Sequence, residues 1–342
     1  MKAARVHEPG KIVIEEVPVP LLGDKEVLIK VHRAGICGTD VGVMHGYVPA
    51  KFPLTVGHEF SGTIAKLGSP SLGGLREGEP VAASAGWGCG NCELCQSGMG
   101  SFCKNRVSLG RNSDGCMAEY VKVDYRVVFP LPPDVSLDEA QNFLNIACAI
   151  QGFKKVPLQL GKRVAIFGAG NMGLIMLQIL KLTGAYEAVA VDAIDFRLEM
   201  AKKFGADHVV NVMRDNPAKT ILGWYPDGAD VVVEATGNPL SFQNACDVIK
   251  ANGALISIGI FSRKVKELDL SFLYYKEPVI YGSKGAEGGY QEAIQLLGKR
   301  RLQIKPMITH RFPLDETAKG FKTLEDQDQA DKALRVVIEP CA

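Results

Sequence analysis

Hydrophobic residues follow two different rhythms along this 342-residue chain. Up to about residue 134, short runs of alternating apolar and polar residues are broken by glycine and proline, which is typical of half-buried β-strands joined by loops. The strands expected in this part are 11–17, 26–31, 62–67 and 118–123. The pattern therefore predicts a mostly β, irregular first region.

From about residue 136 to residue 282, short apolar runs alternate with stretches that have helical spacing. Such alternation predicts βαβ units and a parallel sheet. The run at 231–233 is apolar throughout, as in strands buried on both faces. The expected strands are 164–167, 188–191, 209–210, 229–233, 255–258 and 279–281, and the clearest helices are 174–182 and 194–204.

The last part of the chain, from about residue 283, repeats a helix-then-strand pattern. A helix is expected at 289–297 before a strand at 308–312, and a second helix at 315–324 before a strand at 334–338. We expect these last strands to return to the first, mostly β region.

A glycine-rich motif, GAGNMG, follows the first apolar strand of the middle region and opens an apolar helix. Gly168 permits a tight turn, Gly170 lets the backbone approach a pyrophosphate, and Gly173 allows close packing of helix on strand. Asn171 and Met172 lie at the helix N-terminus, which attracts negative charge. The motif predicts a dinucleotide site, and the alternative is a glycine turn that binds another nucleotide or nothing.

An acidic residue, Asp192, ends the second strand of this region, 24 residues after Gly168. A carboxylate there accepts hydrogen bonds from an adenosine ribose and repels a 2′-phosphate, which favours NAD over NADP. Arg197 lies nearby in the sequence and is the residue that would favour NADP. We therefore predict an NAD site that involves both residues.

Four of the nine cysteines lie within 15 residues, interleaved with glycines, in the pattern C-x2-C-x2-C-x7-C. Four thiolates on a short, glycine-rich loop suit a closed tetrahedral zinc site, and a site with four protein ligands should be structural. The alternatives are two disulfides or an iron–sulfur cluster. The predicted ligands are Cys89, Cys92, Cys95 and Cys103.

A second set of metal-ligand types lies further upstream. Cys37 follows a predicted strand, and His58 and Glu59 come about 20 residues later. A thiolate, an imidazole and a carboxylate leave a fourth position open, as a catalytic zinc requires. Spacing alone does not pair them, since a lone cysteine is usually a core residue and a lone His-Glu usually lies on the surface.

Composition excludes several classes of protein. The 39 Lys and Arg residues against 38 Asp and Glu residues give a net charge of +1, which argues against nucleic acid as the main partner. The apolar stretch 164–182 is too interrupted by glycines for a membrane helix, and the N-terminus lacks the apolar core of a signal peptide. We therefore expect a cytoplasmic protein, in which clustered thiols bind metal more often than they form disulfides.

Taken together, these motifs resemble those of the zinc-dependent medium-chain dehydrogenase/reductase (alcohol dehydrogenase) superfamily, and most of all its sorbitol and threonine dehydrogenase-like branch. The resemblance rests on GICGTD, GHEFSG, the four-cysteine lobe, GAGNMG and EATGN, at 35–40, 57–62, 89–103, 168–173 and 234–238. It covers essentially the whole chain in order.

The resemblance implies an α/β protein with two domains and an active site between them. A GroES-like, mostly β catalytic domain would comprise residues 1–150 and 284–342, with a structural zinc lobe at about 86–106. A doubly wound, parallel-sheet Rossmann domain that binds the dinucleotide would comprise residues 151–283.

Site roles follow from the same resemblance. It implies that Cys37, His58 and Glu59 are the catalytic zinc ligands. Asp40 would orient the imidazole, Thr39 would bond the substrate oxygen and begin a proton relay, and Arg335 would contact the cofactor pyrophosphate. The alternative for Arg335 is a solvated surface charge.

This chain departs from the family pattern at two places. Relatives often carry a relay histidine where this chain has Gly42, and His45 is the nearest candidate to replace it. Many sugar-alcohol dehydrogenases read Glu-Pro before the Rossmann strand, where this chain has Leu144 and Asn145. Neither residue is a strong zinc ligand, so three protein ligands plus water, or weak metal binding, are expected. Cys148 is interpreted as a core residue.

The expected activity is that of a zinc-containing, NAD(P)-dependent alcohol or polyol dehydrogenase, with one catalytic and one structural zinc per chain. A small alcohol or polyol would be its partner, without nucleic acid or membrane, and relatives predict a homodimer or homotetramer. The alternatives are a zinc-free or weakly metallated reductase of the same superfamily and a non-catalytic NAD-binding subunit. A zinc-finger-like binding protein is disfavoured by the few Lys and Arg residues in the lobe.

Overall fold

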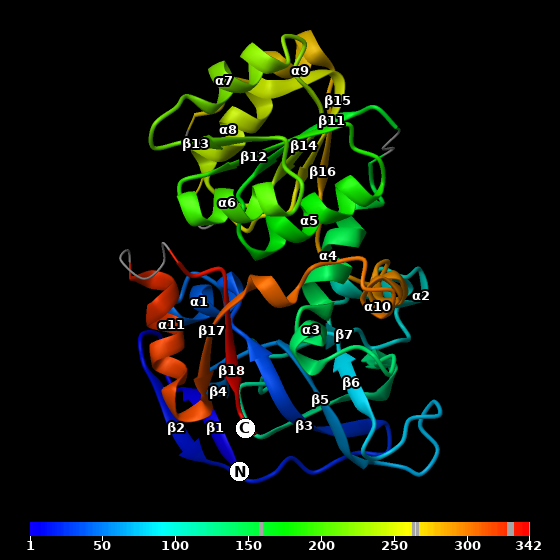
Figure 1. Cartoon of the computed structure of the whole chain (residues 1–342). Coiled ribbons are helices and arrows are strands. Elements are labelled where there is room, and N and C mark those ends of the chain that lie inside the picture. Colours follow the sequence, from blue (N-terminus) through cyan, green and yellow to red (C-terminus); the bar gives the residue numbers. More distant parts are fainter. Residues whose placement is uncertain (157–159, 262–263, 265–266, 327–331, 342) are drawn as a thin grey trace. The chain divides into compact units, whose positions relative to one another are not determined.

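The structure is a computed structural model that describes residues 1–156, 160–261, 264, 267–326 and 332–341. The chain forms two compact units, and the second is inserted into the first (Figure 1). The first unit comprises residues 1–147 and 290–342, and the second comprises residues 148–289. The sequence predicted the second unit at residues 151–283, so each boundary differs by a few residues. Within the described ranges, every helix is too short or too polar to cross a membrane.

The first unit is mostly β, as predicted. Its strands are β1 (Lys2–Val6), β2 (Ile12–Glu16), β3 (Glu26–Gly35), β4 (Leu54–Thr55), β5 (Glu59–Leu67), β6 (Pro80–Ala83), β7 (Gly86–Trp87), β8 (Val107–Ser108), β9 (Tyr120–Asp124), β10 (Val128–Pro130), β17 (Ile308–Pro313) and β18 (Arg335–Glu339). The largest sheet has the order β10-β6-β5-β3-β18-β17, and β9 also pairs with β3. A second sheet has the order β2-β1-β4, and β7 pairs with β8.

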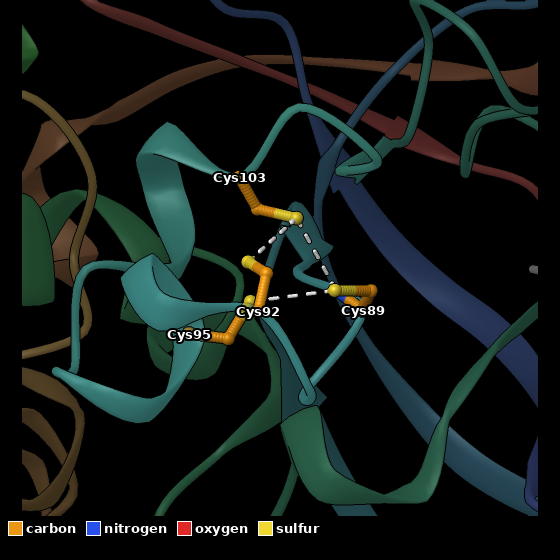
Figure 2. Close-up of side chains that lie close together, drawn as sticks. All are labelled: Cys89, Cys92, Cys95 and Cys103. Atoms are coloured by element: carbon orange, nitrogen blue, oxygen red, sulfur yellow. Dashed lines mark hydrogen bonds between the residues drawn. The ribbon is translucent and has the colours of Figure 1, made fainter.

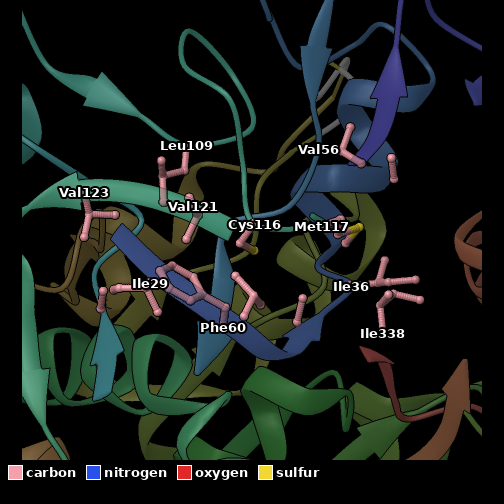
Figure 3. Packing of buried hydrophobic residues seen from close by; sticks show 14 of the residues in the cluster. Ile29, Ile36, Val56, Phe60, Leu109, Cys116, Met117, Val121, Val123 and Ile338 are labelled. Carbon is pink, nitrogen blue, oxygen red and sulfur yellow. The ribbon is translucent and has the colours of Figure 1, made fainter. Parts of the chain in front are cut away.

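Strand β3 organises this unit because it pairs with β5, β9 and β18. Val27, Ile29 and Val31 share one face of the strand and are fully buried, whereas Glu26 and Lys30 on the other face are only partly buried. Figure 3 shows this core, in which Ile29 and Phe60 lie among residues from distant parts of the chain. The core also includes Val56, Leu109, Cys116, Met117, Val121, Val123 and Ile338.

The C-terminal strands return to the first unit, as the sequence predicted. Strand β18 pairs with β3 in antiparallel fashion and with β17 in parallel fashion. A charged cluster ties the same segments together, because Asp138 accepts hydrogen bonds from Arg33 at 2.6 Å and from Arg311 at 2.8 Å. Burial would raise the pKa of Asp138, but the two guanidinium groups hold it below its ordinary value.

Short helices connect the strands of the first unit. They are α1 (Gly38–Met44), α2 (Glu93–Gln96), α3 (Leu137–Ala140), α10 (Tyr290–Gly298) and α11 (Thr317–Glu325), with 3-10 turns η1 (Gly100–Phe102), η2 (Tyr125–Val127), η3 (Lys305–Met307) and η4 (Leu314–Glu316). Helix α4 (Phe143–Phe153) begins in the first unit and ends in the second.

The second unit is a doubly wound α/β domain. Its strands are β11 (Arg163–Phe167), β12 (Glu187–Asp192), β13 (His208–Asn211), β14 (Ala229–Glu234), β15 (Ile249–Ser257) and β16 (Val279–Gly282), all parallel, in the order β13-β12-β11-β14-β15-β16. Helices α5 (Asn171–Leu182), α6 (Asp195–Lys203), α7 (Pro217–Trp224), α8 (Pro239–Val248) and α9 (Ser271–Lys276) join them. The predicted strands and helices of this region are confirmed.

Strand order reverses between β11 and β14, so their carboxyl ends open the crevice in which such folds bind nucleotides. The glycine-rich motif follows β11 at this position. The motif, which directly follows β11 in the sequence, therefore lies at the edge of the sheet where such folds bind nucleotides.

Candidate active site and metal centres

Three metal-ligand side chains come together in the first unit. Cys37 lies between β3 and α1 as the N-cap residue of the helix, His58 immediately precedes β5, and Glu59 is the first residue of that strand. Their Sγ, ring nitrogen and carboxylate oxygen atoms all lie within 4.8 Å of one another. Pairing of β3 with β5 places Gly35 opposite Glu59, which brings the two strand ends into register.

Asp40 orients two of these residues. Its Oδ2 accepts the Cys37 backbone N–H at 2.9 Å, and Cys37 Sγ accepts the Thr39 N–H at 3.5 Å, which together form a capping box at the start of α1. Asp40 Oδ1 lies 2.9 Å from His58 Nδ1, so Nδ1 carries the proton and donates it. The imidazole Nε2 is therefore left with the lone pair that a metal needs.

Glu59 is held from two sides inside the domain. The buried Arg335 forms an ion pair with its Oε2, and the Asn145 Nδ2 donates to its Oε1 at 2.8 Å. Arg335 also donates to Gln141 Oε1 at 2.8 and 2.5 Å, to the Gln141 carbonyl and to the Ile36 carbonyl, both at 3.3 Å. All five guanidinium N–H groups are thus engaged.

This arrangement corrects the pyrophosphate role predicted for Arg335. Its side chain is only 2% exposed, and its donors are used up within the first unit. Gly35 makes the burial possible, because a Cβ there would lie 1.8 Å from Arg335 Nη2. The guanidinium instead supplies the charge that keeps Glu59 ionised and oriented.

The electrostatic balance of the cluster favours a cation. Burial would raise the pKa of Glu59, but Arg335 and His58 hold it below its ordinary value. Burial and the Glu59 charge raise the pKa of the Cys37 thiol, whereas Asp40 and Cys37 outweigh burial and raise the pKa of His58. A divalent cation among the three ligand atoms would favour both the thiolate and the neutral imidazole, so the donor set fits zinc.

The remaining predicted catalytic residues lie on or beside α1. Thr39 is partly exposed, and its Oγ1 lies 3.7 Å from Cys37 Sγ. His45 is half-exposed and pairs with Glu325 at 2.8 Å, and its relay role stays a prediction. At Gly42 a side chain has no room, because a Cβ would lie 2.4 Å from Val48 Cγ2 and 2.8 Å from the Tyr47 ring.

The four lobe cysteines converge on one point (Figure 2). Cys89 and Cys95 have their Sγ atoms 3.9 Å apart, and those of Cys92 and Cys103 are 3.8 Å apart. Sulfur ligands at about 2.3 Å from a tetrahedral ion lie about 3.8 Å from one another, whereas disulfide sulfurs are about 2.0 Å apart. The lobe is therefore arranged for an ion, with every position filled by protein.

A cation lies against the outside of the lobe. Four thiolates around a divalent ion carry a net charge of −2, and Arg126 lies against the loop with its Nη2 at 3.5 Å from the Gly88 carbonyl. Asp124 holds the same guanidinium at 2.7 Å. Arg126 thus links the lobe to the ion pair with Asp124 at the end of β9.

In the second unit the glycine-rich motif has the shape of a phosphate cradle. Gly168 has a φ of +98°, and a Cβ at Gly173 would lie 1.7 Å from the Gly168 carbonyl oxygen. A Cβ at Gly170 would meet no atom within 4 Å, so the backbone is open to a ligand there. Asn171 and Met172 form the first turn of α5, as expected.

Asp192 holds the glycine-rich loop, and its role at the ribose stays a prediction. Its Oδ2 accepts the Ala169 N–H at 2.7 Å and its Oδ1 accepts the Ile194 N–H at 3.0 Å, so the carboxylate holds the glycine loop in place. Arg197 lies half-buried in the first turn of α6. Both residues lie at or just after the carboxyl end of β12.

Comparisons with known proteins agree with this geometry. Residues 23–133 match the alcohol dehydrogenase GroES-like domain, and residues 172–299 match the zinc-binding dehydrogenase domain. The sorbitol dehydrogenase of Bacillus subtilis (strain 168) is 33% identical over 98% of this chain and 94% of its own. The chain belongs to the zinc-type medium-chain dehydrogenase/reductase family. It is an oxidoreductase of the alcohol dehydrogenase type.

Other relatives of the enzyme support the same family. The L-threonine 3-dehydrogenase of Xanthomonas campestris pv. campestris (strain B100) is 35% identical over 99% of both chains. A proposed zinc-binding dehydrogenase from Sinorhizobium meliloti 1021 bound to NADP has a TM-score of 0.92 at 28% identity, covering 99% of both chains. An alcohol dehydrogenase from Escherichia coli CFT073 complexed with NADH has a TM-score of 0.92 at 26% identity, with the same coverage.

Sequence reasoning missed the support around Glu59. Gln141 carried no signal, because it lies 194 residues from Arg335 in the chain. Asn145 was noticed only as a weak ligand at a position of departure, and its bond to Glu59 spans 86 residues. Pairing of β18 with β3 brings Arg335 to this site, and the packing of α4 near β5 brings Asn145 to Glu59.

The ion pair between Arg335 and Glu59 generates a stability prediction. Arg335→Met should lower the free energy of unfolding by about 3–5 kcal/mol, because it leaves a buried carboxylate without its counter-ion. Arg311→Met is the matched control, since Arg311 is a 40% exposed arginine on the adjacent strand, and it should cost less than about 1 kcal/mol. Urea unfolding curves measure both, and equal losses would contradict the role assigned to Arg335.

Proposed function

We propose that this enzyme oxidises an alcohol or polyol to a ketone or aldehyde with NAD, reversibly, and holds one catalytic and one structural zinc per chain. The convergence of Cys37, His58 and Glu59, with Asp40 behind the imidazole, is the single observation that carries this proposal. Two separate groups of ligand side chains within the described residues support the count of two ions.

The chain's own residues have distinct tasks in this reaction. Zinc and NAD, when bound, would supply a Lewis acid and a hydride acceptor. Thr39 Oγ1 accepts the hydroxyl proton of the alcohol while its own proton moves toward solvent, which its partial exposure allows. Asp40 keeps the His58 proton on Nδ1, and Arg335 keeps Glu59 ionised. The alcohol thus loses one proton and one hydride.

Zinc counting tests the two metal sites. The wild-type chain should hold two zinc ions and reduce NAD in the presence of secondary alcohols or polyols. Cys37→Ser should lose one zinc and turnover, because a ligand of the open site is gone. Cys92→Ser should lose the other zinc and unfold more readily, since structural zinc contributes to folding.

Elemental analysis and NADH absorbance provide both readouts. Cys341→Ser, outside both clusters, is the control and should leave zinc content and turnover unchanged. Unchanged zinc content and turnover in Cys37→Ser would refute the catalytic-site assignment.

NAD is the proposed cofactor, in preference to NADP. Asp192 places a carboxylate at the end of β12, and a second carboxylate, Asp195, follows at the start of α6. Asp195 engages Arg214 at 2.7 and 2.6 Å, and this pairing lowers the pKa of Asp195 to about 2. Arg214 is thereby less available for a 2′-phosphate. One similar solved structure is bound to NADP and another is complexed with NADH. The preference for NAD is therefore argued from the charged residues of this chain.

Asp192→Asn tests the preference. The asparagine keeps an oxygen for the Ala169 N–H but removes the charge that repels a 2′-phosphate. The ratio of kcat/KM for NADP to kcat/KM for NAD should rise by about tenfold, the value of a charge interaction worth about 1.4 kcal/mol. An unchanged ratio in steady-state kinetics would exclude Asp192 as the discriminating residue.

A homodimer through β16 is the proposed assembly, on its own or within a homotetramer. This strand lies at the edge of the sheet and exposes Val279 (49%) and Ile280 (40%). Helix α9, just before it, exposes Tyr274 and Tyr275. An exposed apolar edge strand is a template for pairing with a second copy, and a two-fold axis closes the assembly.

Ile280→Lys tests the proposed interface. A charge at the edge should block strand pairing, so light scattering should give the 36.9 kDa mass of one chain instead of a multiple of it. Lys250→Ala, a partly exposed position on the neighbouring strand β15, serves as the control and should leave the wild-type mass unchanged. A wild-type mass of one chain would reject the assembly.

The cytoplasm is the proposed compartment. Seven of the nine cysteines belong to the two ligand clusters or are buried, and the ligand thiols must stay reduced to hold metal. Subcellular fractionation that places the protein in an oxidising compartment would overturn this.

A further inference from the structure

The EATGN segment at 234–238 lies against the glycine-rich motif. It follows β14, the strand next to β11, and leads into α8. The Ala235 N–H donates to the Phe167 carbonyl at 2.9 Å, and a Cβ at Gly168 would lie 2.7 Å from Thr236 Cγ2. Because strand order reverses between β11 and β14, this turn borders the crevice in which such folds bind nucleotides.

Glu234, the first residue of this segment, is fully buried and is held by neutral donors. Its Oε1 accepts the Thr236 N–H at 2.9 Å, the Ser241 hydroxyl at 3.1 Å and the Thr236 hydroxyl. The Gly237 N–H lies 3.2 and 3.1 Å from the two carboxylate oxygens. Within the part of the chain that the structure describes, no lysine, arginine or histidine pairs with this carboxylate, so hydrogen bonds offset its desolvation.

The buried carboxylates of Glu59 and Glu234 are therefore stabilised in different ways. Glu59 has a counter-ion, Arg335, that lies 276 residues away in the chain. Glu234 takes its donors from the seven residues that follow it, which form the turn and the first part of α8. If this turn opened, the buried charge would lose its donors, so the carboxylate favours one conformation of the turn.

The other side of the turn is held by the end of β15. The Ile258 and Gly259 N–H groups donate to the Glu234 carbonyl at 2.9 and 3.1 Å. A Cβ at Gly259 would lie 2.7 Å from Glu234 Oε2, so a glycine is required for this close approach. Thr236 and Asn238, in contrast, have exposed side chains. The turn thus has a buried anchor and an exposed surface.

We propose that Glu234 is a positioning residue, which holds the turn at 235–237 in its binding conformation before the cofactor arrives. The inference rests on the proposed NAD site. Glu234 is 0% exposed and does not touch NAD, so it acts through the backbone of the turn beside Gly168. When only a fraction of the free protein has the binding conformation, the apparent affinity falls by that fraction.

Asp192 offers a comparison on the other side of β11. Its carboxylate, at the end of β12, accepts the Ala169 N–H at 2.7 Å and is partly exposed. Asp192 is proposed to repel the 2′-phosphate of NADP, whereas the buried Glu234 acts on the turn whichever cofactor binds. A change at Glu234 should therefore alter the affinities for NAD and NADP equally.

Glu234→Gln tests the proposal, because it keeps the length of the side chain and removes its charge and one acceptor. The new amide NH2 would face the Gly237 N–H, so the turn should open. In calorimetry without alcohol, the dissociation constants of NAD and NADP should both weaken by about tenfold, with a ratio within about twofold of the wild type. Zinc content should be unchanged, since both ligand clusters lie in the first unit.

Hydrogen exchange reports on the turn itself. The Thr236 and Gly237 amides should be protected in the free wild-type protein and should lose most of that protection in Glu234→Gln. Saturating NAD should restore the protection, because it selects the formed turn. In steady-state kinetics, the KM for NAD should rise by about tenfold while kcat changes by less than about twofold.

Two further variants separate the anchor from general effects of charge. Glu187→Gln is the matched control: Glu187 lies at the amino end of β12 in the same sheet and pairs with Arg163 at 3.1 Å. It should change neither the affinity for NAD nor the exchange of the turn. Ser241→Ala removes one donor to Glu234 and leaves the carboxylate in place, so it should weaken NAD binding by about threefold.

Three results would overturn the inference. One is wild-type affinity for NAD in Glu234→Gln or, if that variant does not fold, in Ser241→Ala. Another is weaker binding without faster exchange of the turn. The third is a changed ratio of the NAD and NADP affinities, since Glu234 would then act on one cofactor directly. Failure of the proposed function looks different: the wild-type protein binds neither NAD nor NADP.

Discussion

The ion pair between Glu59 and Arg335 is the contact on which the rest of the first unit depends. Its partners are 276 residues apart in the chain, and both side chains are 2% exposed. A buried carboxylate is tolerated only with a counter-charge and further donors, and Arg335, Gln141 and Asn145 provide them. Gly35 follows from the same constraint, because any side chain there would overlap the guanidinium.

This ion pair also explains why an interrupted domain can hold one site. The segment 148–289 separates the two parts of the first unit, and β18 brings the last part back beside β3. Arg335 at the start of β18 then meets Glu59 at the start of β5. The hydrogen bonds of Asp138 to Arg33 and Arg311 also hold the C-terminal strands beside β3, at a more exposed position. The charge that orients a candidate ligand thus comes from the opposite end of the chain.

The two metal clusters differ in how they are assembled. The lobe cysteines lie within 15 residues, so local turns alone bring their sulfurs to 3.8–3.9 Å. In the other cluster, Cys37 and Asp40 are held together locally by the capping contact at the start of α1. Glu59, in contrast, is brought to them by the pairing of β3 with β5. The glycine-rich loop is also held by a nearby residue. Asp192, only 23 residues after Ala169, accepts the Ala169 N–H.

By itself, the sequence determined what short-range chemistry can encode. The periods of the strands and helices, the four-cysteine spacing, the glycine motif and the ligand types at 37, 58 and 59 all follow from neighbours in the chain. Only the tertiary structure decided the task of Arg335, the pairing of His45 with Glu325 at the surface and the unpaired oxygen of Asn145. The reason is physical: burial and hydrogen-bond partners depend on residues 86 to 299 positions away, and no local pattern records which of them will meet.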